Sequence, residues 1–293
     1  FINITQDHLD YHKTFEDYLK SKLLIFTKHC DKNSTAIVSR DFRYFSEVES
    51  KLKELGLNYK TIGKESSDYK IEIQNNPSEC LAFKLNGKQI KTSLIGDFQA
   101  YNLTCAIAML EQQSLNADTS LGFDELIQAC SNITSIKGRM EVIETLKPKT
   151  KIVIDYAHTP DGLEKALESL RKYTPNKLSV VFGCGGNRDK EKRKLMGEIA
   201  DKLADKIYIT DDNPRDEKPE DIRKEIISAC PKAIEISSRK QAISQAITDL
   251  KQDDSLLIAG KGHENYQIIA GKKFHFDDAE TVIEICKQNG LLE

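Results

Sequence analysis

The four residues Asp212-Asn213-Pro214-Arg215 combine side chains that suit recognition of a charged small molecule. They follow the apolar run 206–211 and precede an amphipathic stretch, an order typical of the strand, loop and helix of a βαβ unit. Proline fixes one backbone angle, so the turn is stiff and can hold its neighbours in a set direction. Arginine offers a planar fork for a carboxylate, and asparagine offers both a donor and an acceptor. Alone, the motif is more typical of a solvated surface turn. Whether it forms a binding site therefore depends on the segments that surround it.

Three further polar loops are expected beside this one. From residue 148 onwards, apolar runs alternate with amphipathic stretches, which predicts an α/β domain with a mainly parallel sheet and helices on both faces. The loops 155–161, 183–189, 211–215 and 260–264 follow the carboxyl ends of its strands, so they should converge on one crevice. The Gly-rich second loop would let a ligand approach its backbone, but it is not a dinucleotide-binding fingerprint. Two guanidinium groups, an amide and a carboxylate suit a zwitterionic amino acid; they belong to Arg188, Arg215, Asn213 and Glu264.

The N-terminal half holds a second group of residues that could do chemistry. Asp7–His12 contains two carboxylates and two imidazoles, which can bind a metal, although a polar loop is the commoner use of such residues. A helix expected over 14–29, with Thr14 as its N-cap, carries Lys22 beside an apolar stripe. A partly desolvated lysine has a lowered pKa and a more nucleophilic amine, whereas a snorkelling lysine keeps its head in water.

The remaining pattern predicts the elements that position these residues. We place the domain boundary at Lys147-Pro148-Lys149, so that residues 1–147 form one α/β domain and residues 148–293 form a second. Asn86-Gly87 predicts a β-hairpin, and a second short hairpin is expected around Gly271. Strands are expected at 35–39, 58–64, 69–74, 152–155, 178–182, 206–210, 233–236 and 255–259, and helices at 42–56, 96–113, 123–132, 161–173, 190–203, 219–229, 240–250 and 278–288.

The composition narrows the class of protein. With 293 residues, 30% charged and 39% hydrophobic, the chain suits two globular domains. The net charge of −3 gives no sign of nucleic-acid binding, and no apolar run predicts a membrane span. Seven cysteines without C-x-x-C pairs indicate free thiols in a cytoplasmic protein rather than a zinc site. Because Phe1 lies within what reads as the end of a strand, we expect upstream sequence to precede it.

Taken in order, these motifs resemble those of the Mur ligases, ATP-dependent amide-forming enzymes of peptidoglycan synthesis. Each motif is weak alone, but their order along the whole chain is specific. The resemblance implies that the chain contains the C-terminal portion of a central ATPase domain followed by a Rossmann-like C-terminal domain. The motifs are Asp7–His12, Lys22, Gly138-Arg139, Asp155–Asp161, Gly183–Asp189, Asp212–Arg215 and Gly260–Glu264.

More narrowly, the chain resembles the members that add meso-diaminopimelate to UDP-MurNAc-L-Ala-D-Glu. The resemblance implies a cytoplasmic monomer in which the D-glutamate side-chain carboxylate attacks the γ-phosphate of ATP. An amine of diaminopimelate then attacks the acyl phosphate, and phosphate leaves. The resemblance also implies catalytic roles for His8 and Lys22 as Mg²⁺ ligands, with the lysine carried as a carbamate. It implies ATP contacts for Asn102, Arg139, Asp155 and His158. The implied diaminopimelate contacts are Arg188, Asp212, Asn213, Arg215, Gly260 and Glu264.

Three alternatives are open. A lysine-adding member of the family is disfavoured by Arg215, since arginine can pair with the extra carboxylate that lysine lacks. A folylpolyglutamate synthase, which shares the architecture, is disfavoured by the Asp212–Arg215 motif. A non-catalytic amino-acid-binding fragment is disfavoured by Asp7–His12 and Lys22, which binding alone would not need.

The sequence departs from the family pattern in one respect: it contains no G-x-x-x-x-G-K-[ST] phosphate-binding loop. We therefore expect the 293-residue chain by itself to lack ligase activity. Phosphate release after addition of ATP, both substrates and magnesium would contradict this expectation.

Overall fold

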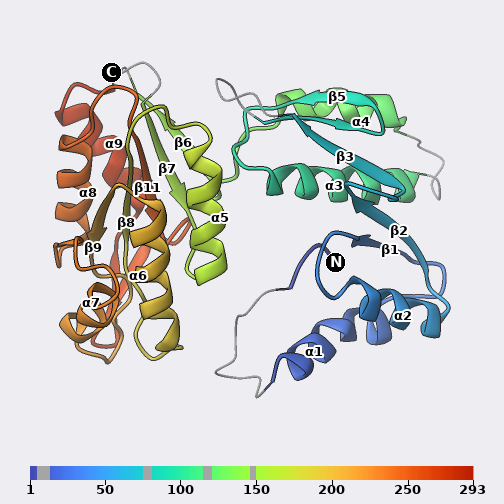
Figure 1. Ribbon diagram of the computed structural model, residues 1–293, viewed down its shortest axis with the longest axis horizontal. Coiled ribbons are helices and arrows are strands. Elements are labelled where there is room, and N and C mark those ends of the chain that lie inside the picture. The colour runs from blue at the N-terminus through green and yellow to red at the C-terminus, as the bar shows by residue number, and fades with distance from the viewer. Residues whose placement is uncertain (5–13, 75–80, 115–120, 146–149, 293) are drawn as a thin grey trace. The chain divides into compact units, whose positions relative to one another are not determined.

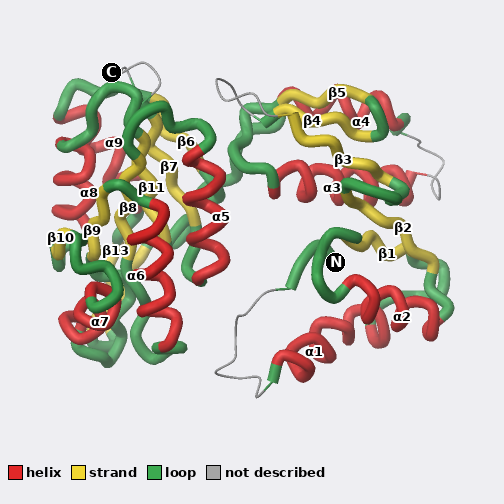
Figure 2. The backbone as a smooth tube through the Cα atoms, viewed as in Figure 1, coloured by secondary structure: helices red, strands yellow, loops and turns green. Residues whose placement is uncertain are grey.

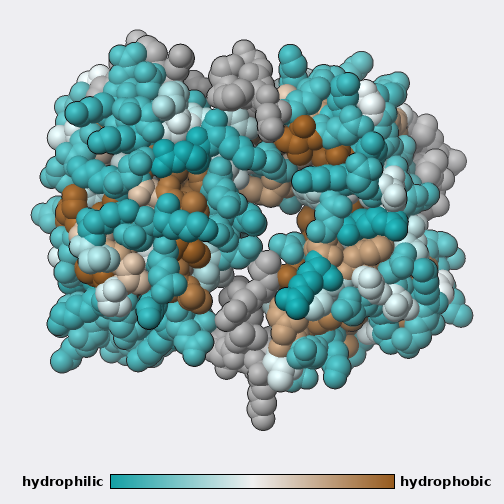
Figure 3. All heavy atoms as spheres, viewed as in Figure 1, coloured by the Kyte–Doolittle hydropathy of each residue, from teal (hydrophilic) through white to brown (hydrophobic). Residues whose placement is uncertain are grey.

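The computed structural model describes residues 1–4, 14–74, 81–114, 121–145 and 150–292. Two compact units, Phe1–Thr134 and Ser135–Glu293, each contain a sheet with its own core (Figure 1). Both are α/β, as the sequence predicts. Among the described residues, no helix has the length and apolar character needed to cross a bilayer. In Figure 3, polar residues cover most of the visible face of the second unit. The described cysteines are free, in agreement with the prediction.

The first unit is built on a five-stranded sheet in the order β1-β2-β3-β4-β5. The first three strands run parallel, and the last two are antiparallel additions. The turn between β4 and β5 is the predicted hairpin, because Asn86 and Gly87 both adopt positive φ angles, 48° and 80°. The strands are β1 (Thr35–Ser39), β2 (Asn58–Gly63), β3 (Tyr69–Gln74), β4 (Ala82–Leu85) and β5 (Lys88–Lys91).

Helices cover both faces of β1. Ala36 and Val38 belong to a cluster with α1 (Phe15–Lys28) and α2 (Phe45–Leu55), whereas Ile37 belongs to the cluster with α3 (Phe98–Ser114). Successive side chains of a strand point to opposite faces, so a continuous apolar run is expected where both faces are covered. The smaller helix α4 (Phe123–Ala129) follows α3, and a 3₁₀ turn (Cys130–Asn132) continues it. Thr14 caps α1 as predicted, since its side chain accepts the N–H of Asp17.

The second unit contains a six-stranded sheet in the order β10-β9-β8-β11-β7-β6. Its strands are parallel except β6, which pairs antiparallel with β7. The elements are β6 (Glu141–Glu144), β7 (Lys151–Asp155), α5 (Pro160–Arg171), β8 (Leu178–Phe182), α6 (Glu191–Leu203), β9 (Lys206–Ile209), α7 (Pro219–Ile227), β10 (Ile234–Glu235), α8 (Arg239–Thr248), β11 (Ser255–Ala259) and α9 (Asp278–Gln288). A separate hairpin, β12 (Tyr266–Ile269) and β13 (Lys272–His275), turns at Gly271 as predicted.

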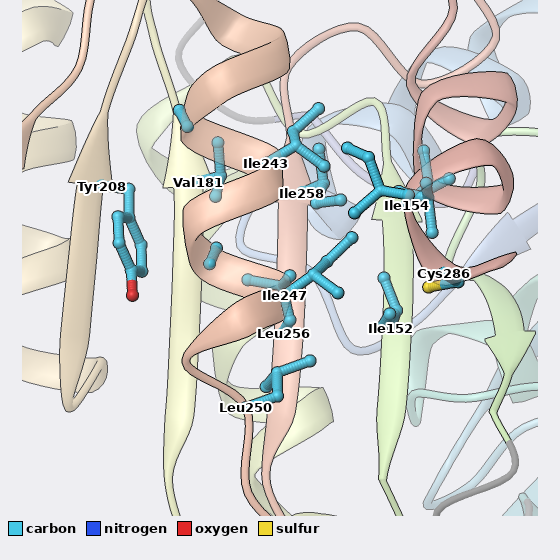
Figure 4. Close-up of a cluster of buried hydrophobic side chains, with 14 of the residues drawn as sticks. Ile152, Ile154, Val181, Tyr208, Ile243, Ile247, Leu250, Leu256, Ile258 and Cys286 are labelled. Atoms are coloured by element: carbon cyan, nitrogen blue, oxygen red, sulfur yellow. The ribbon is translucent and has the colours of Figure 1, made fainter. Parts of the chain in front are cut away.

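Helices pack on both faces of this sheet (Figures 1 and 2). The return from β10 to β11 through α8 places β11 between β7 and β8, so the chain reverses its direction across the sheet. Figure 4 shows side chains of α8, such as Ile243 and Ile247, against Ile154 and Ile258 of the strands. These strands are buried on both faces, which is why their sequences read as unbroken apolar runs.

The division between the units lies before the predicted boundary at 147/148. Strand β6 pairs with β7 through Val142 opposite Val153, which makes it the edge strand of the second sheet. β6 and β7 are consecutive strands, and the charged segment Lys147-Pro148-Lys149 between them gave no sequence signal of their pairing.

A buried arginine joins two loops of the second unit. Arg193 of α6 is 0% exposed and donates to Glu217, at 3.0 and 3.1 Å, and to the carbonyl oxygen of Gly185 at 3.3 Å. Glu217 also accepts the backbone N–H of Asn187. The hydrogen bonds from Arg193 lower the pKa of Glu217 to about 2. The ionised pair therefore ties the Gly-rich loop to the segment after β9.

A second buried pair links α8 to α9. The side chains of Arg239 and Asp278 are both 0% exposed and make two hydrogen bonds, at 2.8 and 2.7 Å. Arg239 also donates to the carbonyl oxygen of Ala259, the last residue of β11, at 3.0 Å. This pair fixes the end of the central strand from which the loop 260–264 departs.

We predict that Glu217→Gln lowers the free energy of unfolding by about 1–2 kcal/mol at pH 7, because Arg193 loses an ionised partner. The pKa of Glu217 is depressed in the folded state, so its contribution is present above about pH 4.5 and is lost towards pH 2. Urea denaturation at several pH values should show the difference from wild type shrinking below pH 4.5. A difference that persists at low pH would assign the effect to packing instead.

We also predict that Asp278→Asn destabilises the second unit by about 3–5 kcal/mol, because it leaves the charge of Arg239 buried without an ionised partner. Glu284→Gln is the matched control, since it breaks the exposed Lys240–Glu284 pair between the same two helices. Thermal unfolding should show a large loss for the first variant and little change for the second. Equal losses would contradict the assignment.

Candidate functional site

Asn213 lies at the centre of the loops that follow the parallel strands. It is 4% exposed, and its Oδ1 accepts hydrogen bonds from the N–H of Ile268 at 3.0 Å and from Lys261 Nζ at 3.3 Å. Its Nδ2 donates to Glu264 Oε2 at 3.0 Å. The sequence suggests an asparagine that offers a donor and an acceptor to a ligand. In the structure the acceptor is already engaged, so only the second N–H of the amide is free of described partners.

Arg215 is held by its backbone while much of its guanidinium stays available. Its N–H donates to the carbonyl oxygen of Ile268 at 3.1 Å, and its own carbonyl accepts the N–H of Ala270 at 2.9 Å. These bonds pair it with the hairpin strand β12, at an unusual φ of 52°. Among described residues, its side chain donates only through Nη1, to Gly186 at 2.7 Å and Asn213 at 3.5 Å. The other guanidinium hydrogens can reach a carboxylate.

The Gly-rich loop approaches the Asp212–Arg215 loop too closely for a side chain. The N–H of Gly186 donates to the carbonyl oxygen of Asn213 at 2.9 Å. A Cβ on Gly186 would lie 2.0 Å from the carbonyl oxygen of Pro214, and one on Gly183 would lie 2.2 Å from that of Thr210. Glycine is therefore required for backbone contact, as well as for any ligand that approaches.

The loop 260–264 joins the same site. Gly260 has a φ of 116°, and its N–H donates to the carbonyl oxygen of Asp155 at 3.1 Å. A Cβ on Gly260 would lie 3.0 Å from Oδ2 of Asp212. Asp212 is buried, and its Oδ1 accepts the N–H of Asn213 at 2.6 Å. The expected convergence of the strand-end loops is thus confirmed by their hydrogen bonds.

A second cluster forms around Asp155 at the end of β7. Its two oxygens accept the N–H groups of Met140 and Ala157, both at 2.8 Å. Burial raises the pKa of Asp155, against the opposing effect of these donors. Arg139 is exposed and lies over the ring of Tyr156, 4.5 Å from its centroid. The positive φ of Gly138, 67°, lets the chain pass directly over Gly262 and His263.

His158 and His263 flank the ring of Tyr156. The ring centroids lie 4.6 Å and 5.2 Å from that of Tyr156. His158 Nδ1 lies 2.9 Å from the carbonyl oxygen of Tyr156, and Lys192 Nζ donates to the carbonyl oxygen of His158 at 3.0 Å. An arginine, a tyrosine and two imidazoles beside a partly buried carboxylate could bind an anionic, aromatic ligand.

In the first unit, the described residues that the sequence predicts to be functional are exposed and do not form a cluster. Lys22 is exposed on α1, with Nζ 5.2 Å from the ring centroid of Tyr18, so of the two alternatives the snorkelling lysine fits better than the desolvated one. Asn102 lies on α3, is exposed and donates to Gln99 at 3.0 Å. His8 and the rest of Asp7–His12 lie outside the described residues. Within the described part of the chain, no three His, Cys, Asp or Glu residues form a metal-binding group.

The structure brings together Asp212, Asn213, Arg215, Gly260 and Glu264, as expected from the sequence. Arg188 belongs to the Gly-rich loop, but its side chain is exposed and, among the described residues, makes no hydrogen bond with this group. Their roles towards a ligand stay predictions.

Two residues that sequence reasoning passed over complete the site. Lys261 lies within the quoted motif Gly260–Glu264, but a lysine between two glycines reads as a surface residue. Gln267 donates to the carbonyl oxygen of Asp212 at 2.9 Å and to that of Asp211 at 3.3 Å. A lone glutamine in a hairpin strand gives no signal of this contact.

Comparison with known proteins finds relatives along nearly the whole chain. The Mur ligase middle domain matches residues 1–110, and the Mur ligase glutamate ligase domain matches residues 138–262. A UDP-N-acetylmuramoyl-L-alanyl-D-glutamate–2,6-diaminopimelate ligase of Rickettsia montanensis is 47% identical over 297 residues, covering 98% of this chain and 60% of the relative. The chain therefore spans about three fifths of the length of this relative.

Solved structures give the same result. A UDP-N-acetylmuramoyl-L-alanyl-D-glutamate–2,6-diaminopimelate ligase superposes with a TM-score of 0.60 at 29% identity, covering 99% of this chain and 60% of that one. The MurF ligase of Thermotoga maritima, in complex with ADP, gives a TM-score of 0.68 at 20% identity, covering 98% and 60%. The latter likeness concerns the fold alone. The two domain matches and the identity over nearly the whole chain place this protein in the Mur ligase family.

Proposed function

We propose that this chain carries the amino-acid-binding site and part of the ATP site of a ligase that adds meso-diaminopimelate to UDP-MurNAc-L-Ala-D-Glu. The observation that carries the proposal is the pairing of Arg215, Asn213 and Glu264 at the convergence of the strand-end loops. The Rickettsia montanensis relative is named for this reaction, which supports the assignment.

The charges of the site match those of diaminopimelate. The guanidinium of Arg215 has hydrogens that are free of described partners, so it can bind a carboxylate in a bidentate manner. Oε2 of Glu264 accepts hydrogen bonds from Asn213 and Lys261. Oε1 has no described donor and can accept a hydrogen bond from an ammonium group. Arg188, on the Gly-rich loop, can supply a second cation. Lysine lacks the second carboxylate and would leave one guanidinium unpaired.

The cluster around Asp155 is the proposed ATP side of the reaction. Arg139 and His158 would contact the nucleotide. Asn102 is a separate proposed ATP contact, which rests on the family resemblance. Membership of the Mur ligase family, whose members are ATP-dependent, supports nucleotide binding here. Positive side chains offset the charge that develops when the γ-phosphoryl group passes to the D-glutamate carboxylate. An amine of diaminopimelate then displaces phosphate from the acyl phosphate and forms the amide.

Magnesium binding by His8 and by Lys22 as a carbamate is part of the proposal. A carbamate and an imidazole are acceptable donors, and the metal would supply charge neutralisation for the phosphates. Lys22 is exposed on α1, so carbon dioxide can reach its side chain; the carbamate itself forms only from the neutral amine. We further propose that the enzyme acts in the cytoplasm as a monomer.

We predict that Arg215→Lys weakens meso-diaminopimelate binding to the 293-residue chain by about 10- to 100-fold, because a bidentate, charged hydrogen bond is lost. Binding of L-lysine should change less than about threefold, so selectivity between the two ligands falls. Isothermal titration calorimetry measures both. Arg215→Ala should weaken diaminopimelate binding further.

The matched control is Arg171→Lys, which makes the same exchange at an exposed arginine of the second unit paired with Asp205. It should leave both affinities unchanged. Undiminished affinity in Arg215→Ala would remove Arg215 from the site and, with it, the argument against a lysine-adding enzyme.

A further inference from the structure

Lys261 is a buried cation whose contacts all lie within the proposed amino-acid site. Its side chain is 0% exposed, and Nζ lies 3.3 Å from Asn213 Oδ1 and 3.3 Å from Glu264 Oε2. The ring of Tyr266 lies below it, with the centroid 5.7 Å from Nζ. Removing an ammonium group from water is costly, so such a lysine is retained only where its partners compensate.

The first consequence of Lys261 is a fixed orientation of the Asn213 amide. Oδ1 accepts from two donors, Lys261 Nζ and the N–H of Ile268. A flipped amide would direct its NH₂ group at both donors, which leaves all of them unsatisfied. The lysine therefore keeps Nδ2 turned towards Glu264, with one N–H directed at Oε2 and the other free of described partners.

The second consequence is a fixed orientation of the Glu264 carboxylate. Lys261 and Asn213 both donate to Oε2, so one oxygen is held by two bonds. The N–H of Glu264 also donates to the carbonyl oxygen of Lys261 at 2.9 Å, which closes the turn between them. The carboxylate is thus immobilised before any ligand arrives, and Oε1 is left as the acceptor.

We propose that Lys261 is a positioning residue that prepares Glu264 to accept a hydrogen bond from an ammonium group of the incoming amino acid, with Asn213 holding the same carboxylate oxygen as Lys261. This rests on the proposed function, because the ligand is the same. Lys261 acts through its neighbours rather than by touching the ligand, since its amine is fully enclosed. Preorganisation of this kind lowers the entropy cost of binding.

The test is a double-mutant cycle between Lys261→Met and Glu264→Gln, read as the Kd of the 293-residue chain for meso-diaminopimelate by calorimetry. Methionine has nearly the length of lysine and no charge. We expect Lys261→Met alone to weaken binding by about tenfold or more. In the Glu264→Gln background, the same substitution should change the Kd by less than about threefold, because the carboxylate that Lys261 holds is gone.

The matched control is Lys273→Met. Lys273 also lies over the ring of Tyr266, 3.7 Å from its centroid, but it is exposed and belongs to β13. Its loss should leave the Kd unchanged. Circular dichroism establishes that each variant is folded; if Lys261→Met unfolds, Lys261→Gln replaces it in the cycle, because glutamine retains an N–H donor for Asn213.

The outcomes separate the two proposals. No binding by the wild-type chain would overturn the proposed function and this inference with it. Wild-type binding with equal losses from Lys261→Met in both backgrounds would show a merely structural role and would overturn the inference alone. A tenfold loss that disappears in the Glu264→Gln background supports it.

Discussion

The geometry of the site depends on a backbone contact between the Gly-rich loop and the loop after β9. The N–H of Gly186 meets the carbonyl oxygen of Asn213 at 2.9 Å, and no Cβ fits beside Pro214. Two neighbouring parallel strands deliver these loops to the same edge, but the contact itself requires glycine. The buried Arg193 also links the two loops, because it donates hydrogen bonds to Glu217. The position of Arg215 depends on both features, because its guanidinium rests on the carbonyl oxygen of Gly186.

The interior of the site is polar and yet satisfied. The side-chain oxygen of Asn213 accepts two hydrogen bonds within the protein, and its Nδ2 donates one. The residue therefore stabilises the loops as well as facing a ligand. The same hydrogen bonds make a charged lysine tolerable at full burial. The hairpin β12–β13 contributes through its backbone, pairing with Arg215 in the manner of an added strand. The polar hairpin thereby forms one side of the site.

The two clusters of the second unit share one connecting loop. Gly260 contacts the end of β7, while Lys261 and Glu264 contact Asn213. The segment before β6 reaches the same loop, because the positive φ of Gly138 allows it to pass over Gly262. If one cluster holds nucleotide and the other an amino acid, the loop 260–264 is the short path between them. The buried Arg239, which donates to the carbonyl oxygen of Ala259 just before this loop, favours a rigid connection.

The sequence by itself determined the elements, the parallel second sheet, both hairpins and the identity of the converging loops, because periodicity, turn residues and strand-end positions are local properties. The motif residues Asp212, Asn213, Arg215, Gly260 and Glu264 could be named for the same reason. Only the tertiary structure decided that β6 belongs to the second unit, that Lys22 is exposed and that Lys261 is buried. It also decided that the acceptor of Asn213 is occupied. Burial and hydrogen-bond partners arise from segments far apart in the chain, such as Asn213 and Ile268, and no local pattern records which of them meet.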